Sequence, residues 1–169
     1  LRRTVIAPHS PAPVPPARAF PRPRPRARML AALILDLDGT LVDTNELHTQ
    51  SWVRAFARHG YQIDADRIRP EIGKGGDHLV PAILGPSADA RDGDALRAAV
   101  SEEFPKLVEE RGVRLFDGVV ELLAELKRRG VRTAIATSSA EDHLAATLAA
   151  AGVDLREHVD AHVHKDDVE

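Results

Sequence analysis

The strongest constraint on the fold lies in residues 33–44, which read LILDLDGTLVDT. Residues 30–37 are apolar except for Asp36, and such a run is typical of a strand buried on both faces of a parallel sheet. Gly39 then allows the chain to turn. Because open α/β sheets bind their ligands at the carboxyl ends of strands, Asp36 and Asp38 are predicted to lie in a functional site.

The rest of the chain alternates between helical and strand patterns. This alternation predicts an α/β fold in which helices cover a parallel sheet. Ser139 and Asp142 have the spacing of a helix cap at the start of an alanine-rich helix. Helices are predicted at residues 46–59, 64–71, 76–84, 93–111, 119–129 and 140–151, and further strands at residues 131–136 and 161–163.

The first strand and the helix at 119–129 are separated by a helical stretch that is too long for an ordinary crossover. We therefore predict a core made of residues 29–43 and 114–169, and an inserted helical module at residues 44–113. Residues 1–28 contain eight of the twelve prolines, seven arginines and no acidic residue. This segment is interpreted as disordered or polyproline-like. The abrupt change in composition at Met29 favours a natural start of the protein at that residue, so the segment before it need not be native.

Composition narrows the classes of partner. The chain has no cysteine, which excludes disulfides and thiolate metal sites and agrees with a cytoplasmic location. Residues 29–169 carry 16 basic and 26 acidic side chains, so a nucleic-acid partner is not expected. No apolar run approaches the roughly 20 residues that span a bilayer, so a membrane partner is not expected either.

The two aspartates suit phosphoryl transfer. Side chains two residues apart on a strand project to the same side, so Asp36 and Asp38 would act together. One carboxylate can attack phosphorus as a nucleophile while the other transfers protons. Both would repel a phosphate ester unless a cation neutralised them, and Mg²⁺ prefers such oxygen ligands. The sequence therefore predicts Asp36 and Asp38 as catalytic residues and as magnesium ligands.

The full string, an apolar run followed by DxDGTL, an apolar residue and Asp, resembles the first motif of the haloacid dehalogenase (HAD) superfamily. The resemblance extends over residues 30–169 and implies a phosphatase-type hydrolase with an aspartyl-phosphate at Asp36 and acid/base catalysis by Asp38. The segment AIATSS resembles the second motif of the family, which implies that Thr137 binds the transferring phosphoryl group and that Ser138 lies near the substrate. Gly39 and Thr40 are expected to contact the phosphate.

The helical module resembles the small α-helical cap of the phosphoglycolate phosphatase and β-phosphoglucomutase-like members. By this resemblance, His48 would meet the active site on cap closure, although a partly exposed helix histidine is an equally ordinary explanation. The loop IGKGGD would bring Lys74 near the leaving group, or leave it as a solvated lysine. A small phosphorylated metabolite is the expected substrate, and the oligomeric state is not readable from the sequence.

The chain also departs from the family pattern. Asp117 stands where relatives have proline, and it is expected to cap a helix. Members of the family use a lysine in a third motif to balance the charge of the nucleophile and the phosphate, and acidic residues in a fourth motif to complete the magnesium site. Neither motif is found in its usual place here. Lys165 precedes the pair Asp166-Asp167 instead of following it. These departures predict a C-terminally truncated chain that is inactive as a fragment.

Three functions remain open at this stage. The leading one is a magnesium-dependent phosphatase, and a related one is a sugar-phosphate mutase in which a second substrate hydroxyl replaces water. A dehalogenase is disfavoured because Asp38 is present. The third is a non-catalytic binding or regulatory remnant.

Overall fold

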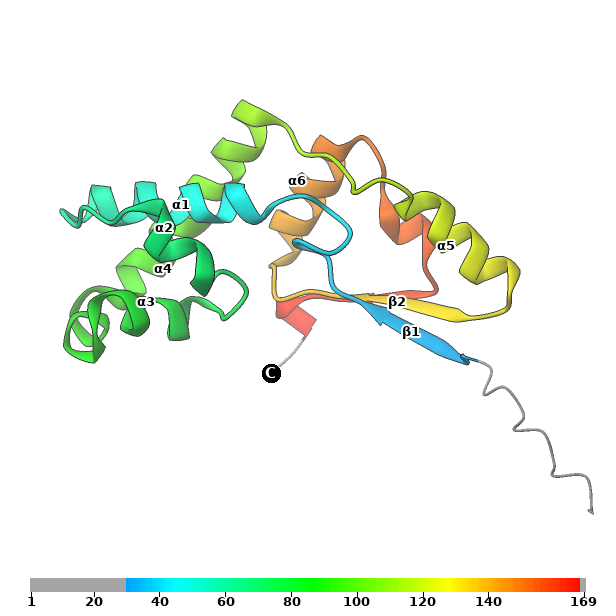
Figure 1. Ribbon diagram of the computed structural model, residues 1–169, viewed down its shortest axis with the longest axis horizontal. Coiled ribbons are helices and arrows are strands. Elements are labelled where there is room, and N and C mark those ends of the chain that lie inside the picture. Colours follow the sequence, from blue (N-terminus) through cyan, green and yellow to red (C-terminus); the bar gives the residue numbers. More distant parts are fainter. Residues whose placement is uncertain (1–29, 168–169) are drawn as a thin grey trace, which may run out of the picture.

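The computed structural model describes residues 30–167, so the expectations for residues 1–28 lie outside it. Three parallel strands form the sheet in the order β1 (Ala32–Leu35), β2 (Arg132–Ala136) and β3 (Ala161–Val163). In register, Leu33 lies opposite Thr133, and Ala136 lies opposite Val163. The prediction of an α/β fold with a parallel sheet is confirmed (Figure 1).

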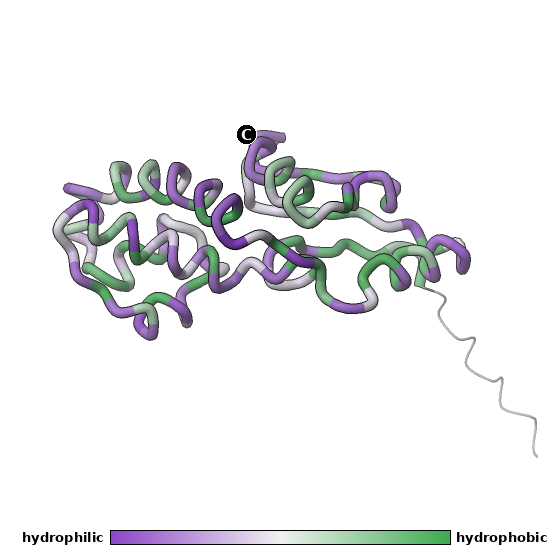
Figure 2. Tube along the Cα trace, turned by 90° about the horizontal axis from the view of Figure 1, so that it is seen from above, coloured by the Kyte–Doolittle hydropathy of each residue, from purple (hydrophilic) through white to green (hydrophobic). Residues whose placement is uncertain are grey.

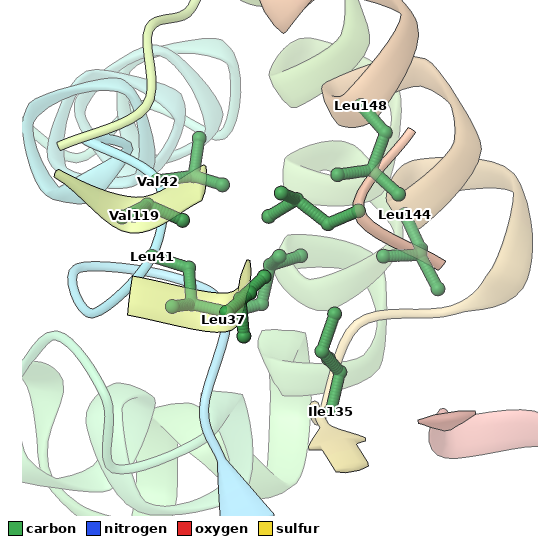
Figure 3. Close-up of a cluster of buried hydrophobic side chains, with 9 residues drawn as sticks. Leu37, Leu41, Val42, Val119, Ile135, Leu144 and Leu148 are labelled. Carbon is green, nitrogen blue, oxygen red and sulfur yellow. The ribbon is translucent and has the colours of Figure 1, made fainter. Parts of the chain in front are cut away.

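Two helices, α5 (Val119–Arg128) and α6 (Glu141–Ala151), lie on the same side of the sheet (Figure 1). Each presents an apolar stripe, and a 3-10 turn, η2 (Leu155–His158), adds one more leucine to the cluster. Figure 3 shows these side chains converging from the loop after β1, from β2 and from both helices. The buried members of this core are Leu37, Leu41, Val42, Val119, Leu123, Ile135, Leu144, Leu148 and Leu155.

The opposite face of the sheet is less covered than the sequence predicts. A strand buried on both faces was expected, but β1 alternates between exposed and half-buried residues. Ile34 is 72% exposed and Val163 is 42% exposed. The prediction is wrong for this strand, because no segment within residues 30–167 buries Ile34.

Residues 45–111 form a helical unit that lies beside the sheet along the long axis of the molecule (Figures 1 and 2). It contains α1 (Asn45–Arg58), α2 (Ala65–Ile68), the 3-10 turn η1 (Arg69–Glu71), α3 (Gly76–Leu84) and α4 (Pro86–Arg111). The helix expected at 64–71 is split, since Pro70 has no backbone N–H to continue it. The helix expected from residue 93 begins instead at Pro86, a residue well suited to the first helical position.

The helical unit has apolar clusters of its own. One consists of Trp52, Phe56, Ile68, Leu79, Val80, Ile83 and Leu96, and a smaller one consists of Leu47, Phe104, Leu107 and Val108. The second cluster lies near the junction with the sheet, because α4 also contacts α6. Among the helices that the structure describes, none has the length and apolar character needed to cross a membrane.

Candidate active site

The loop after β1 is a tight turn that fixes the two aspartates. The backbone N–H of Gly39 donates to the carbonyl of Val42 at 2.8 Å, and the N–H of Leu41 donates to the carbonyl of Leu37 at 2.9 Å. Gly39 has a φ of 71°, and a Cβ at this position would lie 2.5 Å from Oδ1 of Asn45. Only glycine meets both demands without strain. The loop therefore depends on Gly39 for its shape, and its leucines anchor it in the core.

Asp38 is held by three side chains from separate segments. Its Oδ1 accepts hydrogen bonds from Thr44 Oγ1 at 2.7 Å and from His48 Nε2 at 3.0 Å. Its Oδ2 accepts a hydrogen bond from Ser139 Oγ at 2.9 Å. These donors come from the loop before α1, from α1 itself and from the loop after β2. The structure thus brings His48 to Asp38.

Ser139 does not cap α6 as the sequence predicted. The helix begins at Glu141, Ala140 is its N-cap residue, and no cap side chain bonds to the helix. Instead, the carboxylate of Asp166 accepts a hydrogen bond from the backbone N–H of Glu141 at 2.9 Å. The prediction was wrong because the Ser139 hydroxyl is already committed to Asp38, and a distant acidic residue serves the helix end.

The environment of Asp38 stabilises its ionised form. Burial raises the pKa of this carboxyl, but the hydrogen bond and charge of His48, together with the hydrogen bonds of Thr44 and Ser139, lower the pKa to about 2. The side chain is only 19% exposed, so solvent screens these interactions weakly. Asp38 is therefore a carboxylate at neutral pH in the free protein.

This pKa shift predicts a pH-dependent contribution to stability. An aspartate whose pKa is 3.8 when unfolded and about 2 when folded contributes about 2 kcal/mol above pH 4. That contribution is lost as the pH falls through the folded value. Urea unfolding of the wild type and of Asp38→Asn, without divalent metal, should therefore show a difference in unfolding free energy that shrinks by about 2 kcal/mol between about pH 6 and pH 2. The exposed Asp117→Asn variant serves as the control, and a constant difference for Asp38→Asn would contradict the expectation.

Asp36 has a different environment. It is exposed, and its Oδ2 accepts a hydrogen bond from Thr40 Oγ1 at 3.3 Å. Because β1 ends at Leu35, both aspartates lie in the loop and not on the strand as expected. They nevertheless line the same cavity, which has a volume of about 730 Å³. A loosely held carboxylate and a firmly held one thus share one site.

The cavity lies between the core and the helical unit, and an aromatic stack closes one side of it. The rings of His48 and Phe104 stack with centroids 4.2 Å apart, and the ring of His143 lies 5.6 Å from Phe104. His143 Nε2 also donates to the backbone carbonyl of Ser101 at 3.0 Å. These contacts join α1 and α4 of the helical unit to α6 of the core, beside Asp38.

The residues after β2 line two adjoining hollows. Ser138 lines the main cavity together with Asp36 and Asp38. Thr137 lines a shallower neighbouring hollow, and its Oγ1 accepts a hydrogen bond from the backbone N–H of Ser139 at 3.1 Å. Lys165, which was set aside on sequence spacing, lines both hollows. It is therefore a cation that lines the same cavity as the two aspartates.

Lys74 is not brought into the cavity. Its Nζ bonds to Glu71 Oε2 at 2.8 Å, and its side chain is 53% exposed, while Glu71 itself lines the cavity. A substrate role for Lys74 stays a prediction. The sequence did not indicate that Ser139 donates a hydrogen bond to Asp38, or that Arg97 and His143 line the cavity. No local pattern signals such contacts.

A magnesium ion needs oxygen ligands, and the carboxylates of Asp36 and Asp38 line the cavity. Within residues 30–167, no group of three or more histidine or acidic side chains is arranged to hold a metal. Mg²⁺ is commonly held by one or two carboxylates, with water and substrate phosphate completing its shell. The carboxylates of Asp36 and Asp38 on one cavity fit that pattern as a pair.

Curated relatives are similar in sequence to part of this chain. CbbY of Rhodobacter capsulatus is 36% identical over 129 residues, which is 72% of this chain and 56% of that protein. The phosphoglycolate phosphatase of the same organism is 33% identical over 129 residues, 74% of this chain and 58% of that protein. The chain spans about half the length of the curated relatives it matches.

Solved structures also resemble this chain. CbbY of Rhodobacter sphaeroides in complex with phosphate has a TM-score of 0.64 and 29% identity, covering 83% of this chain and 65% of that one. A haloacid dehalogenase-like hydrolase from Bacteroides fragilis has a TM-score of 0.71 at 24% identity, covering 82% and 65%, and shows the fold alone. The family model described as "haloacid dehalogenase-like hydrolase" matches residues 30–169 of this chain. The chain therefore belongs to the haloacid dehalogenase-like hydrolase family.

Proposed function

We propose that this protein is a magnesium-dependent phosphatase that hydrolyses a small phosphorylated metabolite through an aspartyl-phosphate intermediate. The observation that carries the proposal is the contrast between two carboxylates on one cavity. Asp36 is exposed and receives a single long hydrogen bond from Thr40, so an oxygen is available for attack. Asp38 is fixed by three donors, as a proton-transfer group must be.

The first step forms a bond between an Asp36 oxygen and phosphorus, and breaks the bond between phosphorus and the ester oxygen. The leaving oxygen takes a proton from Asp38. In the second step, Asp38 takes a proton from water, which attacks phosphorus and breaks the bond to Asp36. Inorganic phosphate leaves. Because its low pKa makes Asp38 a carboxylate in the free protein, Asp38 returns that proton to solvent and takes one up again when the next ester binds.

Asp36 and Asp38 would hold the magnesium ion, whose charge offsets the repulsion between two carboxylates and a phosphate. Ser138 and Lys165 line the same cavity and would bind the phosphoryl oxygens. Thr137 stays a proposed phosphate ligand through its neighbouring position. Relatives named as phosphatases, and a CbbY structure in complex with xylulose-(1,5)-bisphosphate, support a small phosphorylated substrate.

A sugar-phosphate mutase is the second candidate, favoured by the direct contact of His48 with Asp38. In a mutase, a substrate hydroxyl takes the phosphoryl group in place of water, and His48 would help to orient Asp38 toward that hydroxyl. Release of inorganic phosphate distinguishes the two reactions. A phosphatase releases one phosphate for each ester consumed, whereas a mutase yields an isomeric ester.

The 169-residue chain should turn over slowly. Within its described part, the site offers two carboxylates for magnesium and no cation hydrogen-bonded to Asp36. With p-nitrophenyl phosphate and Mg²⁺, we expect a kcat below about 1 s⁻¹, under the usual range for enzymes, and loss of that turnover in EDTA. Robust turnover would contradict the expected slowness. A complete lack of magnesium-dependent turnover would agree with the inactivity expected of this chain as a fragment.

A further inference from the structure

The cavity has two chemically different walls. The core wall carries Asp36, Asp38, Ser138 and Lys165, where the proposed function puts the phosphoryl group. The facing wall belongs to the helical unit, and it would contact the leaving group. Its charges therefore bear on which phosphate esters the site accepts, an inference that rests on the proposed function.

Two carboxylates line the wall of the helical unit. Glu71 ends the 3-10 turn η1, and Asp77 lies in the first turn of α3. The side chain of Asp77 is 77% exposed, and its Oδ2 lies 3.9 Å from Nε2 of His78. Glu71 is 20% exposed and pairs with Lys74, which is not a lining residue. The acidic groups thus face the cavity, while the lysine that balances one of them does not.

The one arginine that lines the cavity is already paired. Arg97 donates through Nη1 to Asp89 Oδ1 at 2.8 Å and to the carbonyl of Gly76 at 3.3 Å. Its Nη2 donates to Asp94 Oδ1 at 2.9 Å. These two carboxylates, neither of which lines the cavity, offset the charge of the guanidinium. The arginine has little capacity left for an anionic ligand.

The core side adds a further acid near the same wall. Asp142 at the start of α6 lines the cavity, and its Oδ1 accepts from the backbone N–H of His143. Together with Asp77 it makes the leaving-group end of the cavity net negative, because the charge of Arg97 is offset by its own partners. A carboxylate or second phosphate placed there would be repelled, whereas hydroxyl and ammonium groups would find acceptors.

We propose that the site selects phosphate monoesters whose leaving group bears no negative charge, with an amine-bearing polyol such as an amino sugar favoured. The cavity volume of about 730 Å³ accommodates a ligand of that size. Lys165 and the proposed magnesium ion lie on the core side, where they compensate the phosphoryl charge and not the leaving group.

The test uses three esters that share a six-carbon skeleton and a phosphate at carbon 6. Glucosamine 6-phosphate has a cationic leaving group, glucose 6-phosphate a neutral one, and 6-phosphogluconate an anionic one. Because turnover of this chain is expected to be slow, the dissociation constants are measured directly by calorimetry with Mg²⁺. We expect 6-phosphogluconate to bind about tenfold more weakly than glucose 6-phosphate, and glucosamine 6-phosphate to bind at least as tightly as glucose 6-phosphate.

A charge variant and an ionic-strength series locate the cause. Glu71→Gln removes a carboxylate that lines the cavity and should improve binding of 6-phosphogluconate relative to glucose 6-phosphate. The matched change is Glu121→Gln, at an exposed position of α5. It should leave the ratio of the two dissociation constants unchanged. The ratio should also shrink in about 1 M salt, where the Debye length is about 3 Å.

Equal or tighter binding of 6-phosphogluconate, or no binding of any ester, would overturn this inference. The proposed function is tested separately, by the dependence of p-nitrophenyl phosphate turnover on Asp36 and Mg²⁺. A chain that shows this turnover but prefers 6-phosphogluconate keeps the proposed function and loses the substrate class. A chain that shows the expected order of binding without Asp36-dependent turnover keeps the charge selectivity and loses the phosphatase.

Discussion

Asp36→Asn is expected to abolish formation of a covalent phosphoryl adduct and to lower kcat by about 10⁴-fold or more, as loss of a nucleophile does in other enzymes. The asparagine amide has nearly the same shape but cannot attack phosphorus. Since Asp36 is exposed and bonded only to Thr40 among the described residues, the fold should be retained. The adduct is detected by mass spectrometry, as a gain of one phosphoryl group after incubation with acetyl phosphate and Mg²⁺.

Two further variants make this result specific. Asp117→Asn replaces an exposed aspartate that does not line the cavity and should leave the adduct unchanged. Asp38→Asn should still permit attack by Asp36 but slow the hydrolysis that follows, so the adduct should persist for longer. An adduct that forms equally well on Asp36→Asn would exclude Asp36 as the nucleophile.

Phe104→Ala is expected to lower the free energy of unfolding by about 3–5 kcal/mol, the usual cost of deleting a buried aromatic ring. Phe104 is 2% exposed and packs with Leu47, Leu107 and Val108. Its ring also stacks on His48 at 4.2 Å. Because small domains have a total stability of about 5–15 kcal/mol, the loss is a large part of the whole. Urea denaturation followed by circular dichroism measures it.

The control for this variant is Phe116→Ala, which removes a ring that is 36% exposed. Its cost should be well below that of Phe104→Ala, since less apolar surface returns to water. Phe104→Leu should retain much of the stability while removing the aromatic stack on His48. If Phe104→Ala costs no more than Phe116→Ala, the junction between the helical unit and the core does not depend on this ring.

The expected elements were found where local patterns were strong. The stripe of α5, the strand at 132–136 and the helix at 76–84 follow from periodicity and from glycine punctuation, which act over a few residues. The exposure of Ile34 was not predicted, because an apolar run looks the same whether or not another segment covers it. The early start of α4 at Pro86 was also missed, since its first turns are polar.

The sequence by itself determined the parallel α/β fold, through the alternation of strand and helix patterns along the chain. It also determined the pair Asp36 and Asp38, whose signal lies within twelve contiguous residues. Only the tertiary structure decided how the pair is held. Ser139 reaches Asp38 across 101 residues, and Phe104 meets His48 from another helix. Such contacts depend on how packed elements dock against one another, which no local pattern encodes. Docking thus fixes Asp38, whereas Asp36 stays exposed.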